Sequence, residues 1–521
     1  MSAGGCHALS VALLSRSRSR PARRPHAKTT ASTRRHSTTG TTKRGIAPGS
    51  PPGGTRAARC MRTRARRRAT PACARGQEQA SMSAGGGRKH RPDGPALPPP
   101  LSERPARLAA SDCPKVYVYD IPELWDFDAP WSRLHEVPAA AIFGEPCGDG
   151  VPDEFDTQQW SVAMLVLWRL ATSERCGAVA DPNEADLFLV PTWPAAKGLA
   201  AWDRACASDA NGAVKHLKFL NERTAHRHFF VVGKGHAVPK GVCFRWWARP
   251  RGLLRRATRF AYSDQYGSGG PMSSYGPAFL DDPAEAARLQ GDRVLDDGGH
   301  VPHLYSIPYP ANVHAIRGLA TPAAWNRSAG ARPAVASYLA SPRPGPYAVI
   351  REPLSRACEA AGNGACARAD PHGIKSKHFC GLRGTTMAAF FCLQPGGDSP
   401  YRKGFFDAVV SGCVPVVFSQ QLYRVAPWHR GIEALPGVPR AHHAIVFDGR
   451  KVLDGEVDVF SELAKLPAER VAALRRAARR AAPFQQYAVD DDFRMDAFEI
   501  ILRAALAVAE RREAATAPAV A

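Results

Sequence analysis

The amino-acid sequence predicts an α/β protein built from two consecutive layers of parallel strands and helices. Between residues 115 and 232, short strand-forming runs alternate with longer apolar segments, which is the pattern of a parallel sheet covered by helices. A second alternation begins near residue 347. Within it, residues 390–418 predict a strand, a glycine-containing loop, a short helix and a second strand. The chain has 521 residues, which is enough for two or three domains.

The first predicted layer opens with residues 115–120, KVYVYD, whose aromatic and β-branched side chains are typical of a strand. A mostly buried helix is expected over residues 156–172, started by Asp156 or Thr157. We expect three further elements, namely a strand over residues 187–190 stopped by Pro191, a helix over residues 212–225 and a strand over residues 229–232.

Irregular structure should separate the layers. Residues 261–299 predict loops with one short helix, and the Ala, Pro and Arg composition of residues 318–345 predicts a linker. A last helix should run from a cap at residues 490–492 to about residue 511. The second layer should contain a strand over 347–350, the 390–418 segment, a strand over 444–447, and a helix over 467–482 with Arg475, Arg476, Arg479 and Arg480 on its solvated side.

The 390–418 segment has the features of a phosphate site. Its loop contains Gly397, Asp398 and Ser399, and the cations Arg402 and Lys403 follow where a helix should begin. A helix start offers free N–H groups and the positive end of a dipole, which suits a diphosphate.

Asp407, about one helical turn after Lys403, could accept a hydrogen bond from a sugar hydroxyl. The alternatives are a solvated cation pair and a helix acid with only a dipole role. Neither the dinucleotide G-x-G-x-x-G nor the G-x-x-x-x-G-K-[ST] motif occurs in this segment.

Charge is distributed unevenly along the chain. Residues 1–110 hold 23 Lys and Arg but three acids, whereas the remaining residues hold 47 basic and 44 acidic side chains. The acid-poor beginning predicts a disordered leader, with a nucleic-acid-binding tail as the alternative. Its Arg and Ser content is typical of an organelle transit peptide or of a translated upstream region. Its apolar run, residues 8–14, is shorter than the ~20 residues that span a bilayer.

The cysteines predict disulfides rather than a metal site. Their spacing matches no zinc pattern. His300 and His303 lack an evident third ligand, so no metal site is predicted. A cluster of four could form two disulfides in an oxidising lumen, or remain as buried thiols; it consists of Cys358, Cys366, Cys380 and Cys392.

The 390–418 segment also resembles the signature of the exostosin-like glycosyltransferases, in particular their plant branch of xyloglucan-type galactosyltransferases. That signature is close to F-C-L-Q-P-P-G-D-S-x-T-R-R-S-x-F-D-S-x-L-A-G-C-I-P-V, and the chain reads FCLQPGGDSPYRKGFFDAVVSGCVPV. Four further segments resemble family motifs in the same order: KVYVYDIP (115–122), DPNEADLFLVPTW (181–193), HRHFFVVGKGH (226–236) and IPYPANVHA (307–315). Arg351 opens a similar R-x-x-L-x-x-x-C pattern.

The chain departs from the family spelling at a few positions. Lys403 replaces an Arg, Tyr401 and Gly404 replace small hydroxyl residues, and Arg227 replaces an Asp.

The resemblance implies a GT-B fold, with two Rossmann-like domains facing across a cleft. It further implies an inverting transferase that moves a sugar from a UDP-sugar to a glycan hydroxyl, without a metal or other cofactor. The expected divisions are a leader (1–110), an acceptor-side domain (111–325), a nucleotide-sugar domain (326–487) and a helix with a tail (488–521). The expected donor-binding residues are Arg351, Gly397, Asp398, Ser399, Arg402, Lys403 and Asp407.

The resemblance leaves the general base open among His228, His236 and His314. Its members usually sit in the Golgi lumen behind a membrane anchor, so we expect possible Golgi membrane association, although no anchor is visible in this sequence. The expected partners are a nucleotide sugar and a polysaccharide or glycan acceptor, with no nucleic acid. The alternative function is a catalytically silent glycan-binding relative of the same fold.

Overall fold

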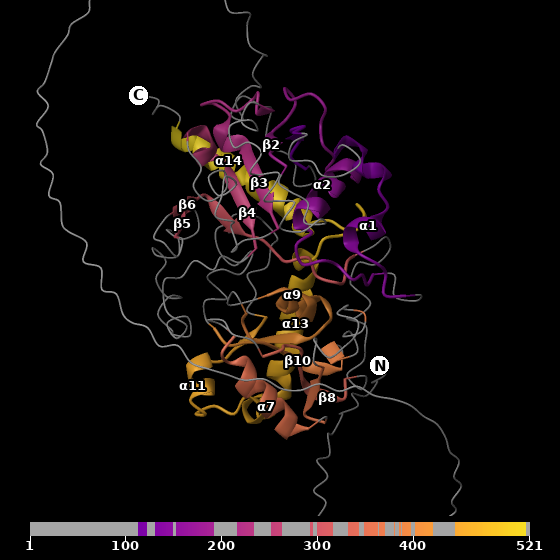
Figure 1. Cartoon of the computed structure of the whole chain (residues 1–521), viewed down its shortest axis with the longest axis vertical. Helices are drawn as coiled ribbons and strands as arrows, with labels where there is room; N and C mark the ends of the chain where they lie inside the picture. The colour runs from indigo at the N-terminus through magenta and orange to yellow at the C-terminus, as the bar shows by residue number, and fades with distance from the viewer. Residues whose placement is uncertain are drawn as a thin grey trace, which may run out of the picture. The chain divides into compact units, whose positions relative to one another are not determined.

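The computed structural model describes much of the chain between residues 113 and 516 (Figure 1). The described residues are 113–121, 131–148, 153–191, 216–233, 252–262, 292–294, 300–315, 332–342, 348–362, 364–369, 380, 385–386, 388–397, 402–419 and 443–516. The chain divides into two compact units, Met1–Arg88 and Lys89–Ala521, and all described residues belong to the second. The predicted leader lies outside the described residues.

The first sheet contains five parallel strands, and strands that are neighbours in the sheet follow one another along the chain. In sheet order they are β1 (Val116–Val118), β2 (Leu187–Leu189), β3 (His228–Val232), β4 (Thr258–Ala261) and β7 (Leu304–Ser306). The strands β2, β3 and β4 are buried along their whole length, as expected for a parallel sheet that is covered on both faces. A separate antiparallel pair joins β5 (Asp292–Val294) to β6 (His300–Pro302).

The helices of this part are short except for α2 (Val162–Thr172). Every α2 residue from 162 to 170 is buried, because its sequence VAMLVLWRL is apolar on nearly all sides. The other described helical elements are η3 (Trp131–Glu136), α1 (Ala139–Phe143), η5 (Ala225–Arg227) and η6 (Gly252–Arg256).

The second sheet also has five parallel strands, but its order reverses. From one edge to the other the order is β9 (Cys366–Arg368), β8 (Ala334–Tyr338), β10 (Ala389–Gln394), β11 (Val414–Val417) and β12 (Ile445–Val446). The chain therefore starts at β8, moves outward to β9, and returns to β10 on the other side of β8. The gap between the ends of β8 and β10 is a topological switch point, the usual ligand position in an open parallel sheet.

The helices around the second sheet have identifiable starts and ends. The carboxylates of Asp448 and Asp458 accept N–H groups in the first turns of α11 and α12, as N-caps do. Gly412, at φ 75°, follows α9 and turns the chain into β11. The helical elements are α7 (Arg351–Ala361), α9 (Lys403–Val410), α11 (Gly449–Leu453), α12 (Val459–Ala464), α13 (Ala468–Ala481) and η10 (Ala482–Gln485).

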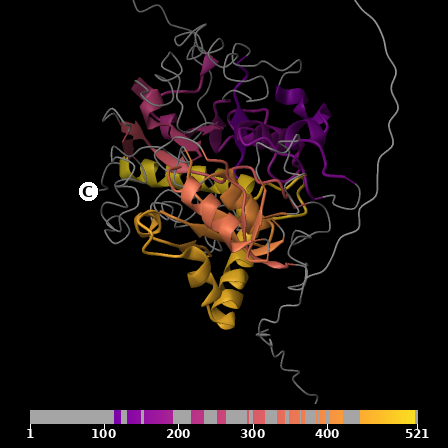
Figure 2. The same cartoon turned by 60° about the horizontal axis from the view of Figure 1, so that its bottom comes forward.

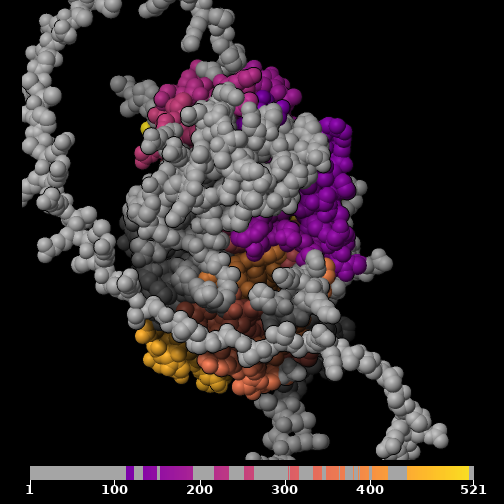
Figure 3. Space-filling view, viewed as in Figure 1, coloured from indigo at the N-terminus to yellow at the C-terminus, as the bar shows by residue number. Residues whose placement is uncertain are grey.

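The carboxyl ends of the two sheets are joined by a hydrogen-bonded contact. Asn312, in the loop after β7, donates its backbone N–H (2.8 Å) and its amide N–H (3.1 Å) to Asp407 Oδ1 on α9. Figure 3 shows a face on which the purple surface of the first part borders the orange surface of the second.

The chain returns to the first sheet after η10. Gln486 accepts the N–H of Ala315 (2.7 Å), and the Tyr487 hydroxyl donates to the carbonyl of Pro308 (2.9 Å). The last helix, α14 (Ala497–Thr516), then packs against β4, α2 and η5 and appears in yellow in Figures 1 and 2. The second sheet is thus inserted between the first sheet and its closing helix.

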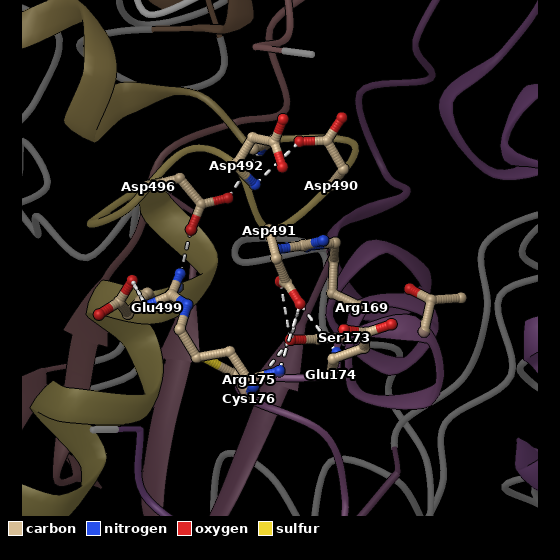
Figure 4. Close-up of polar contacts among 12 residues, drawn as sticks. Arg169, Ser173, Glu174, Arg175, Cys176, Asp490, Asp491, Asp492, Asp496 and Glu499 are labelled. Atoms are coloured by element: carbon tan, nitrogen blue, oxygen red, sulfur yellow. Dashed lines mark hydrogen bonds and ion pairs between the residues drawn. The ribbon is translucent and has the colours of Figure 1, made fainter. Parts of the chain in front are cut away.

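A carboxylate clasp fastens this returning segment (Figure 4). Asp491 accepts hydrogen bonds from Arg169 Nη2 (2.8 Å), the Ser173 hydroxyl (2.8 Å) and the backbone N–H groups of Glu174 (2.8 Å) and Arg175 (3.3 Å). Next to this Asp491 clasp, Glu499 on α14 pairs with Arg175 (2.8 Å). Because Arg169 is 2% exposed, the clasp supplies the carboxylate that such a buried cation requires.

The predicted first layer is confirmed in outline, with two corrections. The helix α2 begins at Val162 and not at Asp156 or Thr157, because residues 154 and 155 form bridges with Val313 and Pro146. The predicted helix over 212–225 is confirmed at residue 216 but wrong from residue 217 onward, since residues 217–224 form turns and irregular backbone and η5 begins at 225. There the Asn221 side chain accepts the N–H groups of Arg223 and Thr224, which competes with helical bonding.

The predicted linker over 318–345, where it is described, and the strand predicted after it are also wrong. Residues 334–338 form β8, an interior strand, while residues 348–350 are a turn that leads into α7. The short AVASY run has only Val335 and Tyr338 as strand-forming residues among small ones, but the parallel neighbours β9 and β10 supply its hydrogen bonds.

Two side-chain assignments near the chain end change. The cap of α14 is Asp496, whose Oδ1 accepts the N–H of Glu499, whereas Asp491 forms the clasp. On α13, Arg475 is partly buried with its guanidinium 5.6 Å from the Phe390 ring centroid, while Arg476, Arg479 and Arg480 are exposed as predicted.

The disulfide prediction holds, but its pairing is wider than the cluster. The only pair within the cluster is Cys358–Cys366, since Cys380 and Cys392 bond to cysteines outside it. The disulfides among the described residues are Cys113–Cys176, Cys147–Cys380, Cys358–Cys366 and Cys392–Cys413. Within these same residues, no helix combines the length and apolarity needed to cross a membrane.

Removing the clasp carboxylate should destabilise the fold. We expect Asp491→Ala to lower the free energy of unfolding by about 2–3 kcal/mol, because it leaves the buried Arg169 without its anion. Asp454→Ala, which removes a surface partner of Arg450, is the control and should cost about 0.5 kcal/mol. Chemical unfolding followed by circular dichroism measures both, and equal losses would contradict a special role for the clasp.

The cap of α14 should make stability depend on pH. Burial raises the pKa of Asp496 to about 6, against the opposing charge of Arg169. Between pH 4 and 6 the folded state holds a proton that the unfolded state has released, so stability falls as pH rises, by about 2–3 kcal/mol. Asp496→Asn should remove this dependence in unfolding curves recorded from pH 4 to 7, and an unchanged pH profile would contradict the assignment.

Candidate functional site

The candidate site lies at the switch point of the second sheet. It is formed by the residues that follow β8 and β10 and by the starts of α7 and α9. Four predicted donor-site residues come together around it, namely Arg351, Gly397, Arg402 and Lys403. These residues are up to 52 positions apart in the sequence (351 to 403). They lie at the same edge of the sheet because the chain goes from β9 back to β10, which is the neighbour of β8.

Arg351 ties the two loops of the switch point together. Its Nε donates to the carbonyl of Gly396 after β10 (2.8 Å), and its Nη1 donates to the carbonyl of Ser341 after β8 (3.1 Å). The side chain is 5% exposed, and its own carbonyl accepts the Tyr338 hydroxyl (2.8 Å). Arg351 therefore holds the loops in position, a task that suits the fixed fork of a guanidinium.

Arg402 stands at the start of α9. It adopts an extended conformation as the N-cap residue, and its Nη2 donates to the carbonyl of Leu339 (3.0 Å). Its side chain is partly exposed, so the cation at the start of α9 keeps some contact with solvent. Burial raises the pKa of Tyr338 to about 12, and the charges of Arg402 and Arg351 oppose that rise. The edge of the sheet is thus rich in positive charge.

Two departures from the family spelling have structural accounts. Gly404 lies against Gln394 at the end of β10, where a Cβ would be 2.5 Å from the side-chain oxygen. Arg227, replacing an Asp, is 1% exposed and donates to the carbonyls of Asp186 (2.8 Å) and Ala185 beside the Phe188 ring. Both residues are therefore in close contact with their surroundings and are not solvated surface positions.

Lys403 and Asp407 form a largely buried ion pair. Lys403 Nζ lies 3.0 and 3.1 Å from the two Asp407 oxygens, and each side chain is 14% exposed. Burial raises the pKa of Asp407 and lowers that of Lys403, while their mutual attraction opposes both shifts. Asp407 Oδ1 also accepts a hydrogen bond from the backbone N–H of Asn312. Asp407 therefore joins the two sheets, a role that the sequence did not suggest.

Two of the predicted bases, His228 and His314, lie in the core. The Nδ1 of His228 donates to the Thr224 carbonyl (2.8 Å), so its Nε2 accepts the Tyr119 hydroxyl (2.8 Å). His314 likewise donates to the Tyr487 carbonyl (2.6 Å) and accepts the Thr157 hydroxyl (2.7 Å).

Both rings are 0% exposed, and burial lowers the pKa of each to about 3. These surroundings suit neutral structural histidines and do not suit a base that must reach a substrate. The third candidate, His236, and the loop residues Asp398 and Ser399 lie outside the described residues.

The described part of the chain contains one group with the composition of a metal site. Cys113, Cys176 and Glu499 bring their ligand atoms within 4.8 Å of one another. Because the two sulfurs form a disulfide, they are not the thiolates that bind a metal. The group instead lies beside the Asp491 clasp and supports the packing of α14.

A line of aromatic rings, which sequence analysis missed, connects the two carboxyl edges. Trp160 contacts Tyr262 (centroids 6.2 Å apart), Tyr262 stacks on Tyr309 (4.1 Å), and Tyr309 contacts Phe406 of α9 (5.9 Å). The rings come from four separate segments, so no periodicity along the sequence could reveal them. We call these four rings the aromatic ladder.

The two carbonyl contacts of Arg351 should be essential for the shape of the site. We expect Arg351→Lys to lower the free energy of unfolding by about 2 kcal/mol, because an ammonium cannot reach both carbonyls as the guanidinium fork does. Arg356→Ala, an exposed position on the same helix, is the matched control and should change stability by less than about 0.5 kcal/mol. Thermal unfolding compares the variants, and a wild-type midpoint for Arg351→Lys would contradict this role.

Comparison with known proteins places the chain in a family. A model described as "Exostosin GT47 domain" matches residues 111–424, a range that contains all the predicted site residues. The chain is 25% identical over 332 residues to "Probable xyloglucan galactosyltransferase GT17" of Arabidopsis thaliana, covering 60% of this chain and 66% of that protein. It is 25% identical over 390 residues to "Xyloglucan galactosyltransferase XLT2" of the same plant, covering 70% and 68%.

The family match covers more than half of the chain and is carried by both sheets. Together with the two parallel sheets, it confirms the α/β class of GT-B type and the resemblance to the plant xyloglucan galactosyltransferase branch. The chain spans about two thirds of the length of these first relatives. The chain belongs to the exostosin GT47 family of glycosyltransferases.

Proposed function

We propose that the protein transfers a sugar, with inversion, from a UDP-sugar to a hydroxyl of a cell-wall or matrix glycan. The observation that carries this proposal is the switch point between β8 and β10, with a glycine loop and a cationic helix start at its mouth. In open parallel sheets this position holds nucleotides. A diphosphate has the charge that such a helix start attracts.

The donor side is assigned to the second sheet. We assign the diphosphate to the N–H groups of the first turn of α9 and of the loop at Gly397, with Arg402 neutralising charge. Asp398 and Ser399 complete the loop in this proposal. Arg351 and the Lys403–Asp407 pair position the loop and the helix, and do not themselves hold the nucleotide.

The chemical step needs little from the donor site beyond charge stabilisation. The acceptor hydroxyl oxygen attacks the anomeric carbon and forms the new glycosidic bond. The bond to the diphosphate oxygen breaks in the same step, and its electron pair leaves with UDP, where the cations and helix N–H groups stabilise the charge. A base takes the hydroxyl proton, and His236 is the remaining histidine candidate for that role.

The acceptor and the compartment are also part of the proposal. Relatives named xyloglucan galactosyltransferases favour a neutral wall polysaccharide as the acceptor. Four disulfides among the described residues favour an oxidising compartment such as the Golgi lumen. Association with the Golgi membrane is proposed from the family.

Nucleotide binding tests the proposal directly. Calorimetric titration of the purified full chain with UDP and UDP-galactose should give measurable affinity, weakened about 10–100-fold in Arg402→Ala through loss of a charge-assisted contact. Arg476→Ala, on the exposed face of α13, is the matched control and should bind as the wild type does.

Transfer to xyloglucan oligosaccharides, followed by mass spectrometry, completes the test. Glycan binding without any nucleotide binding would contradict the proposal and would favour the catalytically silent relative.

A further inference from the structure

The turn before α2 is fixed onto the carboxyl edge of the first sheet. Gly233, which follows β3, touches the turn so closely that a Cβ there would overlap the carbonyl oxygen of Trp160. Tyr262, which follows β4, accepts the N–H of Val162 through its hydroxyl (3.2 Å) and contacts the indole of Trp160. The Ser161 hydroxyl donates to the carbonyl of Gln158 (2.8 Å) and closes the turn.

The turn before α2 presents two amides and an indole to solvent. Gln158 and Gln159 are exposed, and Trp160 is partly exposed, although the helix that follows is buried from Val162 to Leu170. Neither glutamine amide hydrogen-bonds within the described part of the chain. An indole that keeps accessible surface beside two amides offers a flat apolar plate with hydrogen-bond donors and acceptors at its border.

The aromatic ladder connects this turn to the donor side. From Trp160 the rings of Tyr262 and Tyr309 lead to Phe406 on α9, and no step between ring centroids exceeds 6.2 Å. Tyr262 is 1% exposed and Tyr309 is 4% exposed, so the inner rungs are packed and hold Trp160 in place relative to α9. Trp160 is the first ring of the aromatic ladder and Phe406 of α9 is the last. A ligand on Trp160 would therefore lie at the opposite end of the ladder from α9, the helix that starts at Lys403.

We propose that Gln158, Gln159 and Trp160 form the platform that binds a sugar ring of the acceptor glycan. The C–H face of a pyranose stacks on the indole, and its hydroxyls bond to the two amides. This inference rests on the proposed function, because it names the acceptor side of the same reaction.

The platform selects a neutral glycan. Its three side chains are two amides and an indole, so they carry no charge and offer no cation to a carboxylate. An acidic polymer such as an oligogalacturonide would lose hydration of its carboxylates there without gaining an ion pair. A glycan that presents hydroxyls without carboxylates has no such cost.

Direct glycan binding without a donor tests the platform separately from catalysis. Calorimetry of the full chain with xyloglucan oligosaccharides should show binding that weakens about tenfold in Trp160→Ala and is largely restored in Trp160→Phe. Oligogalacturonides of similar length should bind at least tenfold more weakly than the neutral probe. Arg356→Ala on α7 is the control and should leave both titrations unchanged.

A second variant guards against misfolding of Trp160→Ala. The double change Gln158→Ala with Gln159→Ala removes only exposed amides, and it should raise the KM for the acceptor several-fold while leaving the affinity for UDP unchanged. The platform is overturned if both variants bind the neutral glycan as the wild type does, or if the acidic probe binds equally well. If wild-type protein binds the neutral glycan through Trp160 but does not bind UDP, the proposed transfer reaction fails and the platform stands.

Discussion

The fold depends on keeping the carboxyl edges of its two parallel sheets together, and one largely buried carboxylate forms hydrogen bonds directly across their junction. Asp407 on α9 receives Lys403 from its own helix and two N–H groups of Asn312 from the loop after β7. A buried acid is costly unless charge and hydrogen bonds compensate it, and here three donors do so. The same eight-residue helix begins at the switch point. The donor site and the junction of the sheets are therefore built from one element, and neither can shift without the other.

The sequence predicted those elements whose signal is local. The strand, loop, helix and strand of 390–418 follow the predicted order as β10, α9 and β11, because each is marked by its own apolar run and by the glycine that ends the helix. The strand β8 escaped prediction because its five residues gain stability from neighbours on both sides rather than from their own side chains. The Asp491 clasp could not be predicted, since its partners lie more than 300 residues away along the chain.

The candidate site was predictable in part for the same reason. Gly397, Arg402 and Lys403 follow one strand in sequence and stay near its end in space. Arg351 was predicted as a site residue because it opens a family-like motif, although its hydrogen bonds to two carbonyls could not be foreseen. His228 and His314 show the limit of this reasoning, because a sequence reveals a histidine but not its depth, and both lie in the core with each ring nitrogen engaged. Trp160 looked like an ordinary apolar residue of a long helix, and only the later start of α2 sets it at the edge of the sheet.

The position of α14 has a consequence for the order in which the protein can be made. The helix covers β4 and α2, yet it follows the whole second sheet along the chain. The ribosome synthesises the strands of the first sheet long before residues 497–516. The surface of β4 and α2 that α14 covers therefore stays exposed while the second sheet is synthesised and folds. The Cys113–Cys176 disulfide, which lies next to Glu499 of α14, joins residues that are available early and can hold the waiting half together. A nascent chain truncated before residue 497 would thus leave this surface of the first sheet uncovered, even if its second sheet were fully folded.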